Sequence, residues 1–499
     1  MDFRKSAYDA LSVFLEGIIR RKCDRDNTLN ILILGETAVG KSTWINAIAN
    51  YLEYGSLDTA QLSNDPKWKI PLRFTISDDH LNEQTIFVGS EGTKVGESSG
   101  TFPQPYEFMW GNRKVRFIDT PGIGDSHGLP QNKIHLGNIF RYIEEHQIRN
   151  LSAIIILMKP NEKVFTPAFM YCISELFTHL PKRCAENVLF GFTGTRPFHY
   201  QIAATLTPLR QFLATLKERQ NVSLEVSKDT AFCFDNEAFR FLFAALPANG
   251  ITFTDDARKN YAASWGQSVK ETLRFLDRVS SLSPLGTTDM ISLNEARQYI
   301  SVLTKPLALI SDMIEIVNEE IERLLIETRD KQLALEMVVE RLQATLEEYK
   351  AEKEMMGDIA AMFGAFLKKT AIMPFNDAVE KYIKLSIQQA EYMAEITRIP
   401  ADIEHVKTLR DWLERYKQQK QYIEIGAEDG CTASEVKGYF QKLLNLKHCG
   451  RYIKEMFDCE KMGMEDQKKH TSSGAQSHSA GNQPSFFHGI KSWISRITG

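Results

Sequence analysis

The sequence has no apolar run long enough to cross a lipid bilayer. Its longest run, AIIILM at Ala153–Met158, falls far short of the ~20 residues that a membrane-spanning helix needs, and we expect it to form a buried strand. The N-terminal residues MDFRKSAYDALSVFLEG lack the apolar core and the small-residue cleavage site of a signal peptide. These absences predict a cytoplasmic protein, whose contact with a membrane, if any, is peripheral.

The seven cysteines include no CxxC pair, and acidic residues exceed basic ones only slightly. An odd, scattered set of cysteines favours reduced thiols over a disulfide framework. A zinc site at Cys431, His448, Cys449 and Cys459 is the alternative, although its spacing differs from that of common zinc sites. The formal net charge of −4 gives no general reason to expect binding to nucleic acid.

The chain from residue 28 to residue 248 alternates strand-like and helix-like stretches. The candidate strands are NILILG, TIFVG, YEFMW, KVRFID, AIIILM, NVLFGF and TAFCF. The candidate helices are KSTWINAIANYL, KIHLGNIFRYIEEH, TPAFMYCISELFTHL and TPLRQFLATLKER. Because the apolar strand runs are continuous, they fit parallel strands that are covered on both faces. We therefore predict a doubly wound α/β domain over residues 28–248.

After residue 248 the pattern is almost entirely helical, and the whole chain is too long for one core. A helical arm at 249–355 contains a heptad segment at 305–355. A 4-3-4-3 spacing there relates Ile310, Ile314, Val317, Ile321 and Leu324, and the register continues through Leu335, Val338, Leu342 and Tyr349, interrupted by Thr328, Lys331 and Thr345. Two interpretations stay open, a helical hairpin within the chain and a dimerising coiled coil.

Composition and spacing also predict the remaining segments. Residues 1–27 are expected to form an N-terminal helix, residues 356–463 a second helical block, and residues 464–485 a disordered linker. The final segment, 486–499, has no acidic residue, and one helical face would carry Phe486, Phe487, Ile490, Trp493, Ile494 and Ile497. This pattern is typical of a helix that lies on a membrane surface, and docking on the protein itself or on a partner is the alternative.

The stretch GETAVGKS at residues 35–42 satisfies the GxxxxGK[ST] pattern of a phosphate-binding loop, with a strand before it and a helix after it. Glycines let several backbone N–H groups point at one phosphate, and the helix directs its positive end at the same oxygens. We expect Lys41 to bridge the β- and γ-phosphates and Ser42 to ligate Mg²⁺. The nucleotide-binding residues predicted here are Gly35, Glu36, Thr37, Ala38, Val39, Gly40, Lys41, Ser42 and Thr43.

A second motif, DTPG, follows the strand-like run VRFI. Asp119 would hold Mg²⁺ through water, and the Gly122 N–H would contact a γ-phosphate oxygen. In the Gly- and Ser-rich stretch between the two motifs, a mobile hydroxyl is expected to close on Mg²⁺ and the γ-phosphate; Thr101 is the first choice and Ser99 the second. The predicted metal ligands are thus Ser42, Asp119 and Thr101, and the residues predicted to act in catalysis are Thr101, Ser99 and Gly122.

Recognition of the base has no complete motif. Small GTPases read guanine with [NT]KxD, but the corresponding place holds FGFTGTRPF, which has no KxD. One strand later, FCFDNEAF places Asn236 just past a strand end, where its amide would hydrogen-bond a base. The missing KxD keeps an ATPase as an alternative.

The stretches ILILGETAVGKSTWINAIANYL, IDTPGIGD and FDNEAF, together with the missing KxD, resemble the septin-like branch of TRAFAC-class P-loop GTPases, which includes the GIMAP proteins and the chloroplast import receptors. They resemble more closely a set of uncharacterised animal and fungal "G domain-containing" proteins with a long helical region. The resemblance implies a three-layer P-loop G domain with a mostly parallel sheet, followed by an all-α region with coiled-coil character. It also implies that Thr193 or Thr195 occupies the degenerate fourth motif, and Asn236 the fifth.

The same resemblance implies binding of GTP or GDP with Mg²⁺, slow hydrolysis, and homo-dimers or oligomers that pair through G domains or the coiled coil. The residue after DTPG is Ile123, where Ras-like enzymes have a glutamine that positions water. Weak hydrolysis is expected unless another polar group is supplied; Arg196 and His127 are candidates, with a surface or structural role as the alternative. We expect a GTP-controlled switch or scaffold, and a nucleotide-stabilised interaction protein with negligible turnover is the alternative.

Deleting residues 486–499 is expected to reduce co-sedimentation of the protein with anionic liposomes, because the deletion removes the apolar helical face together with Lys491 and Arg496. The measurement is the fraction of protein in the pellet. A full-length variant in which Trp493 and Ile494 are replaced by Ser should lose binding in the same way. Unchanged pelleting of both proteins would favour docking on the protein itself or on a partner.

Overall fold

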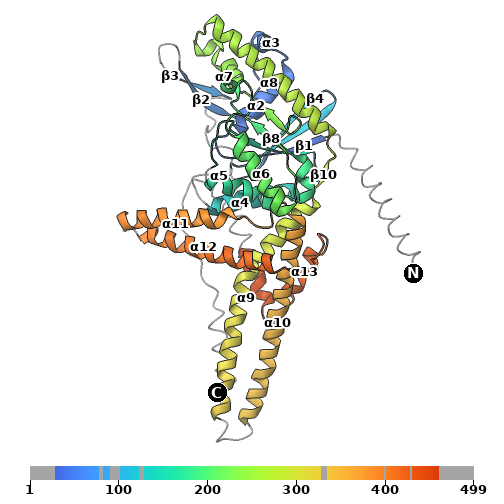
Figure 1. Cartoon of the computed structure of the whole chain (residues 1–499), viewed down its shortest axis with the longest axis vertical. Coiled ribbons are helices and arrows are strands. Elements are labelled where there is room, and N and C mark those ends of the chain that lie inside the picture. Colours follow the sequence, from blue (N-terminus) through green and yellow to red (C-terminus); the bar gives the residue numbers. More distant parts are fainter. Residues whose placement is uncertain are drawn as a thin grey trace, which may run out of the picture. The chain divides into compact units, whose positions relative to one another are not determined.

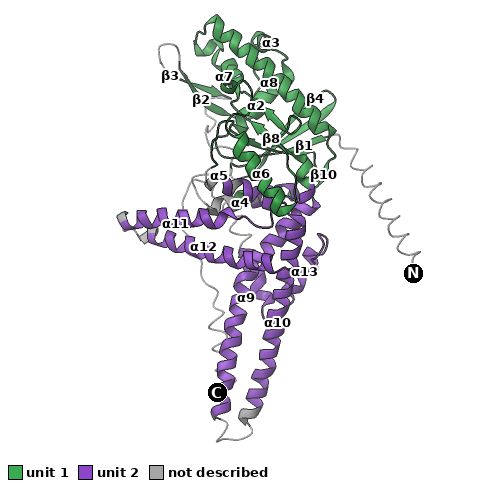
Figure 2. Cartoon of the chain, in the orientation of Figure 1, with its two compact units in different colours: residues 1–135, 145–165, 184–287 green, residues 136–144, 166–183, 288–499 purple. Residues whose placement is uncertain are grey.

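The structure is a computed structural model of the 499-residue chain. It describes residues 28–77, 83–89, 102–122, 129–165, 167–327, 334–397, 400–426 and 430–459. The chain divides into two compact units (Figure 2), of which unit 1 comprises residues 1–135, 145–165 and 184–287, and unit 2 comprises residues 136–144, 166–183 and 288–499. The predicted N-terminal helix, disordered linker and C-terminal segment lie outside the described residues.

A six-stranded sheet forms the centre of unit 1, with the strand order β4-β5-β1-β7-β8-β9 (Figure 1). Its strands are β1 (Thr28–Gly35), β4 (Gln104–Trp110), β5 (Arg113–Asp119), β7 (Ala153–Met158), β8 (Val188–Phe192) and β9 (Ala231–Cys233). All neighbouring strands are parallel except β4 and β5, which are antiparallel. The prediction of an α/β fold with a mostly parallel sheet is therefore confirmed, and the continuous apolar runs of β7 and β8 are wholly buried.

The predicted strand TIFVG lies outside this sheet. It is part of β3 (Glu83–Val88), which pairs antiparallel with β2 (Leu72–Ser77), a strand that the sequence patterns do not predict. A third, short pairing joins β6 (Asn150–Leu151) to β10 (Leu285–Gly286). In the part of the chain that the structure describes, unit 1 contains α2 (Lys41–Glu53), α3 (Leu57–Ser63), α6 (Leu206–Gln220), α7 (Glu237–Ala244), α8 (Asp255–Ser281) and the first part of α4 (Leu129–Glu145). The 3-10 turns there are η1 (Lys182–Asn187), η2 (Arg196–Phe198) and η3 (Pro247–Asn249).

Helix α8 closes the core of unit 1, although its sequence pattern assigns it to the helical arm. The Phe275 ring lies 5.6 Å from Trp44 and 5.2 Å from Phe232, measured between centroids, so α8 packs on both α2 and the sheet. Trp265 is fully buried, and its Nε1 donates a hydrogen bond to the Tyr54 carbonyl oxygen at 3.2 Å. Large buried rings contribute much of the stabilisation of such a core. Unit 1 therefore extends past residue 248.

Unit 2 is helical, and its two longest helices, α9 (Thr288–Glu327) and α10 (Ala334–Thr370), lie side by side (Figure 1). It also contains α5 (Pro167–Thr178), α11 (Ala378–Thr397), α12 (Pro400–Ile425), α13 (Val436–Leu444), a helix at 450–459, and part of α4 (Leu129–Glu145). One core of this unit buries the heptad residues Ile310, Val317, Ile321, Leu324, Leu342 and Tyr349. The stripe is thus covered by packing within the chain, as the hairpin interpretation expects. Within the described residues, no helix is long and apolar enough to span a membrane.

Replacing Phe275 by Ala is expected to destabilise unit 1 by about 3–5 kcal/mol, because the change removes a fully buried ring and leaves a cavity between α8 and the sheet. The measurement is denaturant-induced unfolding followed by tryptophan fluorescence. The matched control is Leu273→Ala on the same helix, where the side chain is 40% exposed and the loss should stay within about 1 kcal/mol. Equal losses in the two variants would contradict the role of α8 in the core.

Candidate functional site

The phosphate-loop residues wrap around the N-terminus of α2. Gly40 precedes this helix with φ 96°, and Ala38 has φ 62°, so the backbone is left-handed at two positions. A Cβ on Gly35 would lie 2.7 Å from the Leu157 carbonyl oxygen, a contact that a side chain does not tolerate. The first N–H groups of a helix have no partner within the helix, and they make this end favourable for an anion.

Lys41 is buried within this loop. Its Nζ donates hydrogen bonds to the carbonyl oxygens of Gly35 and Glu36, each at 3.0 Å. Burial lowers the pKa of Lys41 to about 8, against the opposing effect of the Asp119 and Glu36 carboxylates. Burial, together with the nearby Glu162, also raises the pKa of Glu36. A cation that is buried with incomplete compensation is a group that a bound anion would stabilise.

Gly122 of the DTPG motif lies directly on the phosphate loop. A Cβ on Gly122 would come within 2.7 Å of the Thr37 Cα and 2.8 Å of the Thr37 nitrogen. Asp119 is fully buried at the end of β5, which pairs with β1. The buried His135, which the sequence patterns do not single out, has its Nδ1 3.2 Å from the Gly122 carbonyl oxygen. The structure thus brings the predicted γ-phosphate sensor against the predicted phosphate loop.

Ser42 and Asp119 carry the oxygen ligands that Mg²⁺ prefers. Ser42 is half-buried in the first turn of α2, and the Asp119 carboxylate is close enough to Lys41 to affect its pKa. These two donors fit a Mg²⁺ ion that keeps most of its ligands as water and phosphate oxygens. Thr101 and Ser99 lie outside the described residues. Within the described residues, no three His, Cys, Asp or Glu side chains cluster as a metal site, so the zinc alternative is not supported.

A pocket of about 450 Å³ opens beside the phosphate loop. The loop and the start of α2 contribute Ala38, Val39, Gly40 and Thr43, and the other lining residues follow β7, β8 and β9. Its volume lies within the range of ~300–1,000 Å³ that is typical of small-molecule sites. The pocket lies at the edge of the sheet where the carboxyl ends of the parallel strands meet, and ligands of open α/β sheets bind at this edge.

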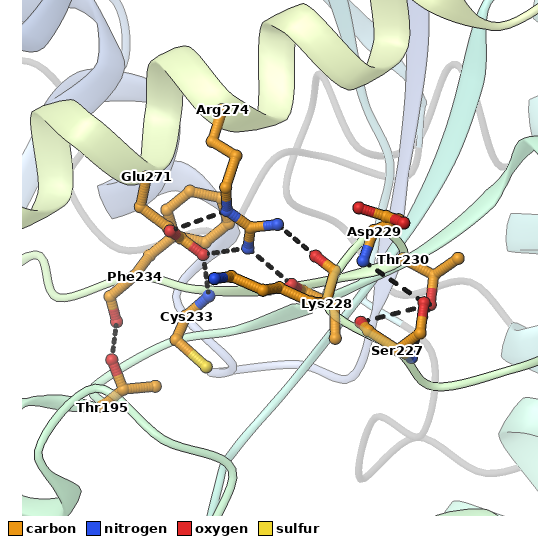
Figure 3. Close-up of polar contacts among 10 residues, drawn as sticks. Thr195, Ser227, Lys228, Asp229, Thr230, Cys233, Phe234, Glu271 and Arg274 are labelled. Carbon is orange, nitrogen blue, oxygen red and sulfur yellow. Dashed lines mark hydrogen bonds and ion pairs between the residues drawn. The ribbon is translucent and has the colours of Figure 1, made fainter.

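Asn236 and Thr193 reach the pocket, whereas Thr195 does not line it. Asn236 is 6% exposed, and its Oδ1 has no hydrogen-bond partner among the described residues. The Thr193 Oγ1 donates to the Val39 carbonyl oxygen at 2.5 Å, so this side chain also supports the phosphate loop. Thr195 is fully buried and donates to the Phe234 carbonyl oxygen at 3.0 Å (Figure 3). Of the two threonines predicted for the fourth motif, Thr193 is therefore the pocket residue.

The loop after β7 forms a wall of the pocket that the sequence patterns do not predict. It contributes Lys159, Asn161 and Glu162. Thr205 holds this loop, because its Oγ1 donates to the Lys159 carbonyl oxygen at 2.9 Å and accepts from the Glu162 N–H at 2.7 Å. The sequence feature that could have indicated this wall is the place of the loop, which directly follows a buried parallel strand next to β1.

Two arginines lie near this end of the site, and they differ in what they contact. Arg240 lines the pocket, and its Nη1 lies 3.3 Å from the Glu237 Oε1, so a cation and an anion share the rim. The Arg196 guanidinium lies 4.5 Å from the centre of the Tyr261 ring and is not among the lining residues. This contact favours a structural role for Arg196 over a role in the pocket.

Helix α8 holds the end of β9 (Figure 3). The Glu271 Oε1 accepts a hydrogen bond from the Cys233 N–H at 3.1 Å, and the Arg274 Nη2 donates to the Ala231 carbonyl oxygen at 2.7 Å. The Arg274 guanidinium also lies 4.2 Å from the centre of the Phe232 ring. Burial, reinforced by Glu271, raises the pKa of the Cys233 thiol to about 12. These contacts fix the backbone that leads into the pocket.

No protein-family model matches this chain, and no curated protein matches it. Solved structures that are similar include Toc33 from Arabidopsis thaliana in complex with Mg²⁺ and GMPPNP, with 13% identity, 55% of this chain and 93% of that chain covered, and a TM-score of 0.30. Cdc11 from Saccharomyces cerevisiae has 14% identity, with 51% of this chain and 100% of that chain covered, and a TM-score of 0.19. The G-domain-like fold follows from the strand order and the phosphate loop of this chain itself.

Burial of Lys41 predicts a specific pH dependence of stability. Its pKa is about 8 in the folded protein and 10.5 ordinarily, so the unfolded chain holds the proton more tightly between these pH values. The contribution of Lys41 to stability therefore rises as the pH increases through this window, by up to about 3 kcal/mol. The test compares the free energies of unfolding of the ligand-free wild type and Lys41→Met across the window.

The difference between the two proteins should move in favour of the wild type as the pH rises. Lys159→Met, at an exposed lysine on the pocket rim, is the control, and its difference from the wild type should stay nearly constant. A pH-independent difference for Lys41→Met would show that Lys41 keeps its ordinary pKa in the folded protein.

Proposed function

We propose that this chain binds a guanine nucleotide together with Mg²⁺, hydrolyses GTP slowly, and acts as a nucleotide-controlled switch or scaffold. The observation that carries the proposal is a single pocket lined both by the phosphate loop and by Asn236. A nucleotide has the matching composition, with anionic phosphates at one end and a flat base with hydrogen-bonding edges at the other. The loops that line this pocket follow four neighbouring strands, so both ends of the site lie along one edge of the sheet.

At the phosphate end, the N–H groups at the start of α2 and the Lys41 ammonium hold the β- and γ-phosphate oxygens. The Ser42 hydroxyl, water on Asp119, and Thr101, which lies outside the described residues, would hold Mg²⁺, and the ion would neutralise charge that develops on the phosphates. Gly122 lies against the phosphate loop, which supports the proposal that its N–H senses whether a γ-phosphate is present. Loss of that phosphate on hydrolysis then releases the DTPG segment, which is the switch.

The base end supports guanine over adenine. The Asn236 Oδ1 is a buried acceptor without a partner among the described residues, and the Glu237 carboxylate lies on the same rim. Two acceptors match the N1–H and the 2-amino group of guanine, whereas adenine presents an acceptor at N1. A site built to accept hydrogen bonds rejects a base that lacks the donors, because its polar groups would stay unpaired.

Slow hydrolysis is supported by the groups that the pocket offers. Arg196 stacks on Tyr261 rather than lining the pocket, so it is poorly placed to stabilise charge on a transferring phosphoryl group. Ile123, outside the described residues, stands where a glutamine would position water. A second copy that pairs through its G domain would supply the missing polar group for hydrolysis. Residues 486–499 would associate with a membrane surface. GTP turnover too slow to measure would favour the alternative, a nucleotide-stabilised interaction protein.

Nucleotide released by denaturing the purified protein is expected to be GDP or GTP when it is identified by chromatography. Lys41→Ala should weaken nucleotide binding by at least about 100-fold, because it removes a buried, hydrogen-bonded charge that pairs with the phosphates. Lys159→Ala, on the exposed rim of the same pocket, is the matched control and should retain the nucleotide. Adenine nucleotide in the released fraction would establish the ATPase alternative, and unchanged binding by Lys41→Ala would remove the phosphate-site assignment.

A further inference from the structure

Asp235 is a junction between the segments that form the base end of the pocket. It lies between β9 and α7 and is fully buried. The Ser264 Oγ donates a hydrogen bond to its Oδ2 at 2.6 Å. Burial raises the pKa of Asp235, and the Ser264 hydroxyl, the charge of Arg196 and the nearby backbone N–H groups of Glu237 and Arg196 oppose that rise. The Asp235 Oδ1 has no hydrogen-bond partner among the described residues, so the carboxylate depends on the Ser264 hydroxyl.

The Tyr51 hydroxyl of α2 donates a hydrogen bond to the Asp235 carbonyl oxygen at 3.0 Å, and the other groups that hold this junction come from helix α8. Ser264, Ser268 and Glu271 are spaced i, i+4 and i+7, so they share one buried face of the helix. The Ser268 Oγ donates to the Asp235 carbonyl oxygen at 2.7 Å and accepts from the Asp235 N–H at 3.3 Å. Glu271 binds the Cys233 N–H at 3.1 Å. These contacts fix the backbone immediately before the asparagine that enters the pocket.

We propose that Ser264 and Ser268 are positioning residues for base recognition: acting through Asp235, they set the place of Asn236 and thereby the base selectivity of the pocket. The inference rests on the proposed nucleotide function. Ser264 bonds the Asp235 carboxylate, and Ser268 bonds its backbone. A buried carboxylate or backbone group that loses a hydrogen-bond partner carries a desolvation cost, which it relieves by moving toward another partner or toward water. Removing either hydroxyl therefore shifts the Asp235 segment, and the neighbouring amide moves with it.

The phosphate end of the pocket has separate anchors. Lys41 hydrogen-bonds carbonyl oxygens of the phosphate loop itself, and Gly35 packs on Leu157 of β7. These contacts pass through neither α8 nor Asp235. A link between the two ends runs through the Tyr51 hydroxyl, near the C-terminal end of α2, and the serine variants retain it. Loss of the α8 serines is therefore expected to change selectivity for the base while affinity for the phosphates is retained, a separation that a general loss of stability would not produce.

The test measures dissociation constants for GDP, inosine diphosphate and ADP with the full-length protein carrying Ser264→Ala, Ser268→Ala or both. Each single change is expected to reduce the preference for GDP over ADP by about tenfold, while the affinity for ADP stays nearly constant. The matched control is Thr272→Val, because Thr272 is buried on α8 and its hydroxyl makes no hydrogen bond among the described residues. This variant should keep the wild-type preference.

A double-variant cycle tests whether the serine acts through the carboxylate. Ser264→Ala should change the preference in the wild-type background and have little effect in the Asp235→Asn background. Ser268→Thr, which keeps the hydroxyl, should behave as the wild type. Thermal unfolding of every variant, including the singles, identifies any that fail to fold.

Wild-type base preference in the folded serine variants would overturn the inference and leave the proposed function intact. A wild-type protein that binds none of the three nucleotides would overturn both. If the wild type prefers ADP, the guanine assignment fails. The ratio of the dissociation constants for GDP and ADP still tests the role of the serines. Loss of the wild-type preference in the serine variants supports the positioning role, and an unchanged preference overturns that role.

Discussion

The candidate site depends on the parallel register of β1 with β5 and β7. In this register Ile33 pairs with Asp119 and Gly35 pairs with Leu157, so the three strands end at the same edge of the sheet. Because parallel strands carry their outgoing loops at one edge, the phosphate loop, the DTPG segment and the loop after β7 meet there. A slip of one residue would turn the side chains of a buried strand to its other face and separate Asp119 from the phosphate loop.

The phosphate end could be predicted from the sequence because its residues are contiguous and its requirements are local. The backbone at position 40 is left-handed, and the backbone at position 35 closely approaches the neighbouring strand. Both conditions favour glycine, so they are visible in the sequence as Gly40 and Gly35. The sheet was predictable for a similar reason. A strand such as β7, which is buried on both faces, requires an unbroken apolar run, and that run is visible without any knowledge of its neighbours.

At the base end, the sequence pointed to Asn236, which lines the pocket, but the choice between the two threonines and the place of α8 could not be predicted, because they depend on contacts between distant segments. Thr193 and Thr195 stand two positions apart in one loop, and the sequence does not say which of them faces the pocket. Tertiary contacts decide: Thr193 bonds the phosphate loop, and Thr195 bonds the end of β9. Helix α8 has an amphipathic pattern like that of the helices after it, and no local feature shows that Trp265 and Phe275 pack in unit 1.

Two buried ionisable side chains of opposite sign stand at the two ends of the pocket, and their partners distinguish their roles. Burial lowers the pKa of Lys41 and raises that of Asp235, so each charge is held at a cost. Replacing buried charges with apolar groups of similar volume is often neutral or stabilising, so burial alone does not explain why a charge is present. The Asp235 carboxylate accepts a hydrogen bond from the Ser264 hydroxyl and does not line the pocket, which favours a structural role for this charge. Lys41 uses two carbonyl oxygens of its own loop, while an ammonium has three donors, and this incomplete coordination in an anion-binding helix terminus is what marks it as a charge that binds a ligand.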